Sequence, residues 1–184
     1  MPRGRPRAIT RSSDAAYVEY VTGKALWFRR VAFLLCRDLD RADDLVQTSV
    51  TKLYADWARI RNVENLDGYA RTIIVNTFLA EQRSPWWKRV VLDHEAELEE
   101  PRVEPEDLDL GLDLGEALST VPPRQRAVLV LRYYCDLSVQ EAADVLGCST
   151  GTVKSQAARG LVALRKHLAA QSDDPVTEEP ENAR

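Results

Sequence analysis

The sequence predicts an all-α protein made of two small helical domains that an acidic linker joins. Three observations support this prediction. Apolar residues recur at helical spacing in two blocks, the stretch between the blocks combines many acids with Pro101 and Pro105, and no stretch of useful length shows the apolar–polar alternation of a strand. The second block is expected to fold as four helices, two of which form a helix-turn-helix.

The composition limits the class of protein. A chain of 184 residues can form one ordinary domain or two small ones, and 45% hydrophobic with 29% charged residues is typical of a globular protein. The longest runs without a charged side chain, residues 72–80 and 145–153, are nine residues long, whereas a membrane span needs about 20 apolar residues. No apolar stretch follows the N-terminal arginines. Neither membrane insertion nor a secretory signal is therefore expected.

Residues that could carry out chemistry are few. Cys36, Cys135 and Cys148 are far apart and form no C-x-x-C pair, which disfavours a zinc site and a disulfide scaffold. The first two are expected in the core. His94 lies in the acidic stretch and His167 near a helix end, so no general base with partners is visible. The sequence predicts a protein that is not an enzyme, holds no metal or cofactor, and works in the reducing cytoplasm.

The net charge of −4 hides a segregation of charge along the chain. Residues 1–92 carry +6, residues 93–116 carry −10, residues 117–171 carry +4 and residues 172–184 carry −4. Because charges act over a Debye length of about 8–10 Å, each basic block can act on its own partner. Two basic blocks suit a polyanion such as nucleic acid. The alternative is that surface charge varies and the acidic runs maintain solubility, and charge alone does not decide.

The first block predicts three helices. Apolar residues from Val31 onward recur at helical spacing, a polar turn is expected over residues 38–41, and a second helix is expected to begin at Ala42. A loop is expected over residues 59–64. Asn65 then caps the N-terminus of the third helix.

The Ser-Pro step at residues 84–85 should end the third helix. The composition of the chain changes after this step. The tryptophans at 86–87 begin a short apolar patch that is expected to pack at the end of the first domain. Residues 93–109 are acidic and hold two prolines, so they cannot bury enough apolar surface to offset the entropy of ordering and should form a linker. The acidic residues 173–184 are expected to be a frayed tail.

The second block predicts four helices. The first covers residues 110–118 and ends at the VPP sequence of residues 121–123. These prolines also begin the next helix, over residues 124–134, because Pro is tolerated in a first turn and not in a helix interior.

The last two helices have the layout of a helix-turn-helix. Ser138 and Glu141 form a capping-box pattern before a short helix, and Gly147 ends that helix. Ser149 caps a long helix that runs to about Leu168. Its outward side chains are hydroxyls and cations, which reach phosphates and base edges in a major groove. They are Thr150, Thr152, Lys154, Ser155 and Arg159. The alternative is a helical hairpin with no role in DNA binding.

Three segments of the second block resemble the promoter-binding C-terminal domain of bacterial RNA polymerase sigma factors. They are residues 121–126 (VPPRQR), 138–143 (SVQEAA) and 151–155 (GTVKS). In the first block, residues 42–47 (ADDLVQ) resemble the sigma helix that docks on the polymerase clamp, and residues 69–77 (YARTIIVNT) resemble the helix that contacts and opens the −10 element. Two such blocks on a short linker resemble the extracytoplasmic-function group of the sigma-70 family, of the sigma-E type.

The resemblance implies a factor that binds core RNA polymerase and directs promoter recognition and DNA melting. It implies a region 2 domain over residues 14–90, an acidic linker over 91–109, a region 4 domain with the helix-turn-helix over 110–170, and an acidic tail over 171–184. The implied partners are the clamp region of core polymerase, promoter DNA and an anti-sigma factor. The linker together with the radii of the two domains can bridge two promoter elements, since 17 extended residues reach about 55–60 Å and two DNA turns span about 70 Å.

Carried onto this chain, the resemblance assigns three groups of site residues. The group that contacts core polymerase is Asp44, Gln47, Thr48 and Tyr54. The group that contacts the −10 element is Asn62, Asn65, Arg71, Asn76 and Arg83. The group that contacts the −35 element is Thr150, Thr152, Lys154, Ser155 and Arg159. Family members often carry an acid after the glutamine, where Thr48 stands here.

Other interpretations stay open at this point. Asp43 and Asp44 could stabilise a helix N-terminus instead of meeting a partner. Tyr69 could stack on a base, although its helical spacing favours a core position. The chain could instead be an ordinary helix-turn-helix regulator that binds DNA without polymerase. That function would account for residues 138–168 but would leave the helix that carries Asp44 and Tyr54 without a role.

Overall fold

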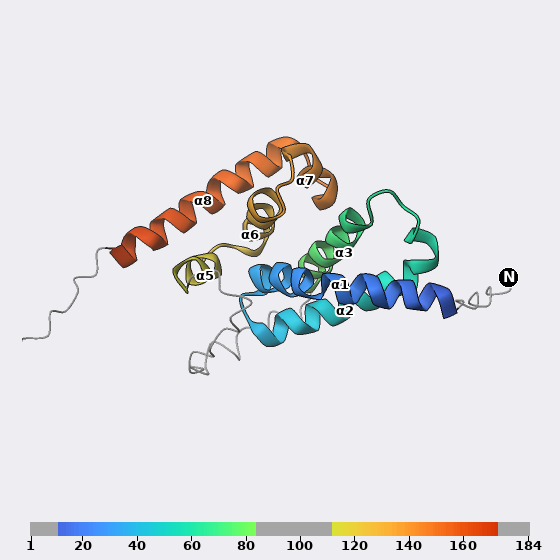
Figure 1. The fold of residues 1–184 in the computed structure, drawn as a ribbon. Helices are drawn as coiled ribbons and strands as arrows, with labels where there is room; N and C mark the ends of the chain where they lie inside the picture. Colours follow the sequence, from blue (N-terminus) through green and yellow to red (C-terminus); the bar gives the residue numbers. More distant parts are fainter. Residues whose placement is uncertain (1–10, 84–111, 173–184) are drawn as a thin grey trace, which may run out of the picture.

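The computed structural model describes residues 11–83 and 112–172, and all regular structure in these two ranges is helical. Figure 1 shows the chain order of the elements. They are α1 (Arg11–Cys36), α2 (Leu39–Ile60), α3 (Leu66–Glu81), α5 (Leu112–Ser119), α6 (Pro123–Leu129), the π-helical turn η2 (Val130–Tyr134), α7 (Val139–Leu146) and α8 (Thr150–Ser172). The prediction of an all-α fold with a four-helix second domain is confirmed. The predicted linker, the tryptophans at 86–87 and the acidic tail lie outside the described residues.

Helices α1 to α3 form a first unit around one apolar core. The periodic apolar side chains of α2 turn inward, so Leu45, Leu53 and Trp57 are almost completely buried. Phe28 of α1 and Phe78 of α3 fill the space opposite them. The side chains on the other face of α2 remain exposed and available to a partner.

The start of α2 differs from the prediction. A polar turn was expected up to Arg41, but the helix already begins at Leu39. The reason is the side chain of Asp38, which accepts a hydrogen bond of 2.7 Å from the backbone N–H of Arg41 and caps the helix. The reversal from α1 is made at Arg37, whose φ is 59°. The expected loop at 59–64 is also shorter, because α2 continues to Ile60.

The predicted helix caps are confirmed where the structure describes them. Asn65 caps α3 by accepting a 2.7 Å hydrogen bond from the N–H of Gly68. Ser138 and Glu141 form the capping box of α7, with hydrogen bonds of 3.1 and 2.7 Å. Gly147 ends α7 with a φ of +60°, a conformation that Gly adopts most easily. These local signals fix the turn between α7 and α8.

Helices α5 to α8 form a second unit. Its helix-turn-helix is closely packed because Ala142 and Ala143 are small and buried, which lets Val153 of α8 reach the core with no exposed surface. Gly160 permits a similar approach of α8 to α6, since a Cβ there would lie 2.9 Å from a methyl carbon of Leu129. The long helix extends to Ser172, beyond the predicted end near Leu168.

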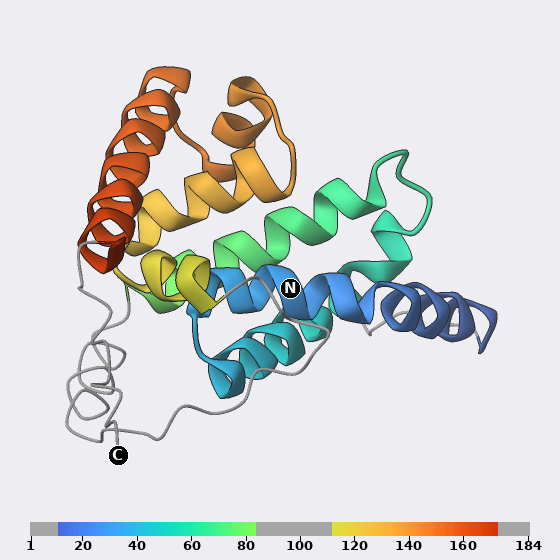
Figure 2. The same ribbon diagram turned by 60° about the vertical axis from the view of Figure 1, so that its left-hand side comes forward.

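The two units pack on each other. Figure 2 shows α3 of the first unit lying along α6 and α7 of the second. Helix α1 also touches α6 and η2. Cys36 is buried, as predicted, and Cys135 is half-buried at the end of η2. Among the described residues, no helix is both long and apolar enough to cross a membrane.

Candidate functional site

The first candidate surface is the exposed face of α2. Asp44, Gln47 and Thr48 are all exposed and follow one another at helical spacing, while Leu45 and Ser49 face the core. The structure therefore brings three of the four predicted polymerase contacts together on one accessible face.

Tyr54, the fourth predicted contact on α2, lies farther along the helix and is tied to α1. Its ring packs 4.9 Å from that of Tyr17, and its hydroxyl donates a 3.1 Å hydrogen bond to Asp14. The hydrogen bond to the Asp14 carboxylate raises the pKa of Tyr54. Because the ring is still 37% exposed, it can contact a partner as well as hold α1.

The two neighbouring acids of α2 have different surroundings. Asp43 accepts a 2.9 Å hydrogen bond from Arg29 and joins α2 to α1. Asp44 is exposed. Neither acid lies in the first turn of α2, where Asp40 stands instead. This position weakens the alternative that the pair acts by stabilising the helix N-terminus, because that effect is confined to the first turn.

The second candidate surface is the loop between α2 and α3. Asn62 and Val63 are exposed at its tip. The side-chain oxygen of Asn65 is occupied by the cap of α3, which leaves its amide NH₂ group as the donor that could face a base. The exposed Val63 was absent from the sequence-based candidates. The sequence feature that points to it is an apolar residue between Asn62 and Asn65 in an otherwise polar loop.

Two side-chain networks hold the ends of this loop. On one side, Asp56 accepts hydrogen bonds from the Tyr69 hydroxyl at 2.8 Å and from Arg59 at 2.9 Å. On the other side, Asp67 accepts hydrogen bonds from Lys24 at 2.6 Å and from Tyr20 at 2.9 Å. The loop is therefore anchored to both α1 and α2, a suitable arrangement for presenting its tip rigidly.

Acid is expected to release the Asp67 anchor. Burial by itself would raise the pKa of Asp67, but hydrogen bonds from Lys24 and Tyr20 outweigh burial and hold that pKa below its ordinary value. Such a group stabilises the fold above its unfolded pKa of about 4 and loses this contribution as pH falls through the lower, folded pKa. The free energy of unfolding should therefore fall more steeply below about pH 5 in the wild type than in Asp67→Asn. Urea unfolding at a series of pH values measures both profiles, and parallel profiles would contradict the prediction.

Two clefts open along the contact between the units. One cleft lies between α3 and α7 and contains Asn65, Tyr69 and Arg71 on the first unit. The other cleft lies between the end of α3 and the helix-turn-helix and contains Asn76 and Arg83. Four of the five predicted −10 residues therefore line the boundary with the second unit. Sequence reasoning left Tyr69 out, because helical spacing alone does not distinguish a core ring from one at the edge of a cleft.

Arg71 faces the second unit directly. Burial raises the pKa of the Cys135 thiol, and the charge and hydrogen bond of Arg71 act against that rise. Hydrogen bonds with Ser138 lower the pKa of Glu141 on α7, and the charge of Arg71 acts in the same direction. The side chain of Arg71 therefore lies beside Cys135, which directly follows η2, and in the cleft that Glu141 of α7 also lines.

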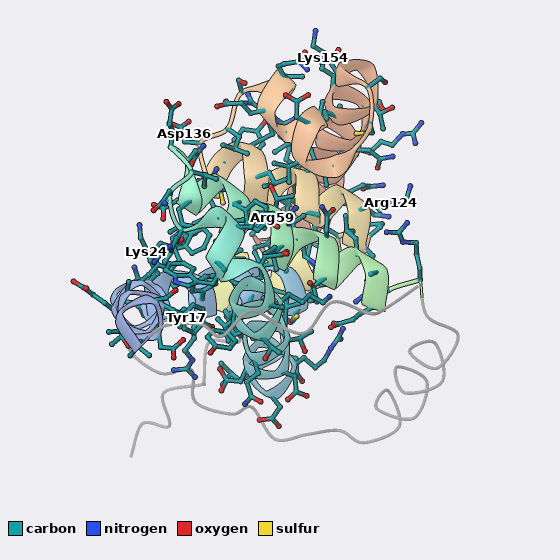
Figure 3. All side chains as sticks on the ribbon, turned by 90° about the vertical axis from the view of Figure 1, so that its right-hand side faces the viewer. Tyr17, Lys24, Arg59, Arg124, Asp136 and Lys154 are labelled. Atoms are coloured by element: carbon teal, nitrogen blue, oxygen red, sulfur yellow. The ribbon has the colours of Figure 1, made fainter. Side chains whose placement is uncertain are left out.

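The third candidate surface is the start of α8. Thr152, Lys154, Ser155 and Arg159 are exposed there, and Thr150 is half-exposed. The turn supports this surface, since the backbone N–H of Thr152 donates a 3.2 Å hydrogen bond to the Ser149 hydroxyl. Figure 3 shows Lys154 at the outer end of the second unit with its side chain directed away from the body. The structure thus presents cations and hydroxyls on the outer surface of a helix-turn-helix.

Comparisons with known proteins agree with this arrangement. The chain matches the family descriptions "Sigma-70 region 2" over residues 25–88 and "Sigma-70, region 4" over residues 111–164. It is 33% identical over 165 residues to the RNA polymerase sigma-E factor of Streptomyces coelicolor, covering 86% of this chain and 89% of that protein. It is 31% identical over 134 residues to the ECF RNA polymerase sigma factor EcfG of Rhodopseudomonas palustris, covering 71% of this chain and 73% of that protein.

Solved structures show the same fold. The sigma factor RpoE of Bartonella quintana, in complex with the anti-sigma factor NepR, aligns with a TM-score of 0.65 at 27% identity, covering 83% of this chain and 98% of that one. CnrH, in complex with the cytosolic domain of CnrY, aligns with a TM-score of 0.57 at 19% identity, covering 85% and 90%. The chain therefore belongs to the extracytoplasmic-function group of the sigma-70 family, whose members direct RNA polymerase to promoters and initiate transcription.

Proposed function

We propose that this sigma factor is a non-catalytic, cytoplasmic subunit with separate surfaces for polymerase, the −10 element and the −35 element. Residues 14–90 form the domain that binds core polymerase and the −10 element, and residues 110–170 form the domain that binds the −35 element. Residues 91–109 link them and residues 171–184 form the tail. The observation that carries the proposal is the exposed set of cations and hydroxyls at the start of α8, which follows a turn fixed by Gly147.

Core polymerase is proposed to bind the exposed face of α2. A carboxylate at Asp44 with the amide of Gln47 one turn later suits a basic partner surface, since complementary charges steer association and fix the register of two helices. Thr48 stands where an acid is common in the family, so this chain relies on fewer charges at that contact. Tyr54 adds an exposed ring at the far end of the same helix.

The −10 element is proposed to bind the anchored loop and α3. Unstacking a base costs a few kcal/mol, so the protein must provide polar groups and a ring for the extruded base. Asn62 and the NH₂ group of Asn65 supply polar groups, and Tyr69 supplies a ring beside them. Val63 can act as an apolar wedge at the tip of the loop. Arg71, Asn76 and Arg83 continue this surface along α3.

The −35 element is proposed to bind the first turns of α8 in the major groove. Lys154 and Arg159 provide charges for phosphates and guanine edges, while the hydroxyls of Thr150 and Thr152 lie at the end of the helix that enters the groove. The hydroxyl of Ser155 donates a 2.9 Å hydrogen bond to the carbonyl of Thr152, so it reaches DNA as an acceptor.

An anti-sigma factor is proposed as a further partner. The solved sigma factor RpoE of Bartonella quintana, which is 27% identical to this chain, was bound to the anti-sigma factor NepR. The likeness in fold to RpoE extends over 83% of this chain, which supports a partner of the same kind.

The decisive experiment is run-off transcription with purified core polymerase on genomic fragments. The wild-type chain should produce defined start sites, and their absence would overturn the proposal. DNA binding without any association with polymerase would instead identify an ordinary helix-turn-helix regulator.

The α2 face can be tested separately. Asp44→Arg should weaken binding to core polymerase about 10- to 100-fold, because the reversed charge would repel a basic partner surface. Glu19→Arg is the matched control, since Glu19 is also an exposed acid but lies on α1. Titration of core polymerase with labelled chain measures both affinities. Equal losses in the two variants would contradict the assignment of Asp44.

A further inference from the structure

One long face of α8 carries charge that nothing in the described part of the molecule neutralises. Helix α8 contains four cations and no acidic residue, and all four cations are exposed. None of them forms an ion pair within residues 11–83 and 112–172. They are Lys154, Arg159, Arg165 and Lys166. Only the first two belong to the proposed −35 contact, so the charge extends well beyond that contact along the helix.

The four cations lie on either side of an apolar stripe. With about 3.6 residues per turn, Lys154 and Arg165 fall on one edge of this face, and Arg159 and Lys166 fall on the other. Exposed apolar side chains lie between the two edges, and the largest of them, Val162, is 63% exposed. The stripe consists of Ala158, Val162 and Ala169. The cations and the stripe together form the outer face of α8.

The chain that directly follows α8 has the complementary pattern. Residues 173–184 carry five acids and one arginine. Val176 stands between two pairs of these acids, at residues 173–174 and 178–179. An apolar residue flanked by acids therefore follows a helix face on which an apolar residue is flanked by cations. Complementary charge of this kind steers a segment to a surface and fixes its register there.

The lengths of the two segments also agree. Lys154 is the cation farthest from the end of α8 and stands 18 residues before it, which is about 27 Å along the axis. Residues 173–181, when extended, reach about 30 Å. Val162 lies about 15 Å before the helix end, and Val176 can reach about 13–14 Å from that end. A segment that turns back along α8 can therefore bring its acids to the cations and Val176 close to Val162.

Attachment to α8 is what makes such a contact effective. Exposed ion pairs are individually weak, so the same acidic segment as a separate peptide would bind poorly. A short tether raises the effective concentration of the segment to the millimolar range. A contact with a dissociation constant of about 1 mM would then be formed in a large share of the chains. The other acidic stretch, residues 93–109, lacks this advantage because α5, α6 and α7 separate it from α8.

We propose that residues 173–184 bind the outer face of α8 in the free chain and compete there with DNA. The contact itself depends on no assignment of DNA-binding residues. Its consequence rests on the proposed binding of the −35 element, because Lys154 and Arg159 belong to both surfaces. Carboxylates of the segment occupy the positions that phosphates take in the complex, so DNA must displace the segment to reach these cations.

The contact is tested by NMR on the full-length free chain, through the backbone amide shifts of α8. One variant replaces four acids of the tail by their amides. The matched control replaces four acids of the 93–109 stretch, so that both proteins gain the same charge. The tail variant is Asp174→Asn, Glu178→Gln, Glu179→Gln and Glu181→Gln, and the control is Glu95→Gln, Glu97→Gln, Glu99→Gln and Glu100→Gln.

At low salt, amides of residues 155–169 should shift in the tail variant and keep their wild-type positions in the control. High salt should move the wild-type amides toward those of the tail variant, because salt screens exposed charges. Unchanged amides in the tail variant would overturn the proposal and leave the acids a role in solubility alone. Shifts in the control without shifts in the tail variant would also overturn it and would identify residues 93–109 as the occupant.

Titration of a short DNA duplex without a promoter into the same samples tests the competition. Contacts to phosphate are independent of sequence, so this probe is sufficient. The tail variant should bind the duplex about three- to tenfold more tightly than the charge-matched control, because no segment has to be displaced. Equal affinities, or no binding by either protein, would overturn the competition and count against DNA binding by α8. The amide shifts without DNA would still decide whether the segment binds α8.

Discussion

Reversing two charges on α8, in the double variant Lys154→Glu with Arg159→Glu, is expected to reduce promoter affinity at least about 100-fold. Both side chains are exposed on the proposed major-groove helix. Each contact between a cationic side chain and a phosphate releases a counterion from the DNA. Losing two such contacts lowers the affinity for the promoter. It also reduces the slope of log affinity against log salt concentration by about two. Two added carboxylates repel the phosphates and increase the loss. Neither residue is part of the core, so the fold should be unchanged.

Lys166→Glu is the matched control for this variant. Lys166 is exposed on the same helix but stands 12 residues beyond Lys154, which places it about 18 Å farther along the axis. Promoter binding by the assembled polymerase is measured at several salt concentrations for all three proteins. If Lys166→Glu loses as much affinity and as much salt slope as the double variant, general repulsion explains the effect and α8 does not read the −35 element.

The largest expected effect on stability comes from Trp57→Ala, which should lower the free energy of unfolding by about 3–5 kcal/mol. Trp57 is 2% exposed and lies 5.3 and 5.8 Å from the rings of Tyr17 and Tyr20. Its indole N–H donates a 2.9 Å hydrogen bond to the carbonyl of Ser13. The substitution removes the packing that fastens the first half of α1 to α2 and leaves a cavity in its place.

Trp57→Phe separates packing from the hydrogen bond. It keeps an aromatic ring but leaves the buried carbonyl of Ser13 without its donor, so its effect should be smaller, about 1–3 kcal/mol. Urea unfolding followed by circular dichroism gives both values from the shift in midpoint. If Trp57→Ala lowers the free energy of unfolding by less than about 1 kcal/mol, Trp57 does not hold α1 against α2.

The helix boundaries that local side chains set were predictable. The caps at Asn65 and Ser138 and the stop at Gly147 are formed as expected because each depends on residues within about four positions. The start of α2 was placed three residues late because polar residues 38–41 suit a turn as well as a capped helix. The hydrogen bond from the backbone N–H of Arg41 to the Asp38 side chain favours the capped helix over the turn.

The candidate site was predictable in part. An exposed polar residue on an amphipathic helix follows from periodicity, and Asp44, Gln47 and Lys154 are exposed as their spacing indicates. Periodicity does not show which exposed residue meets a distant helix. For that reason the position of Arg71 against Glu141 and Cys135 was not foreseen, and neither was the cleft that Tyr69 lines.

The amino-acid sequence by itself determined the helices, their caps, the helix-turn-helix and the family, because these depend on spacing and motifs over short distances. Only the tertiary structure decided that α3 lies on α6 and α7, and that the guanidinium of Arg126 is buried between the units. The physical reason is that packing between segments far apart in the chain depends on the fit and charge of whole surfaces, which no local pattern records.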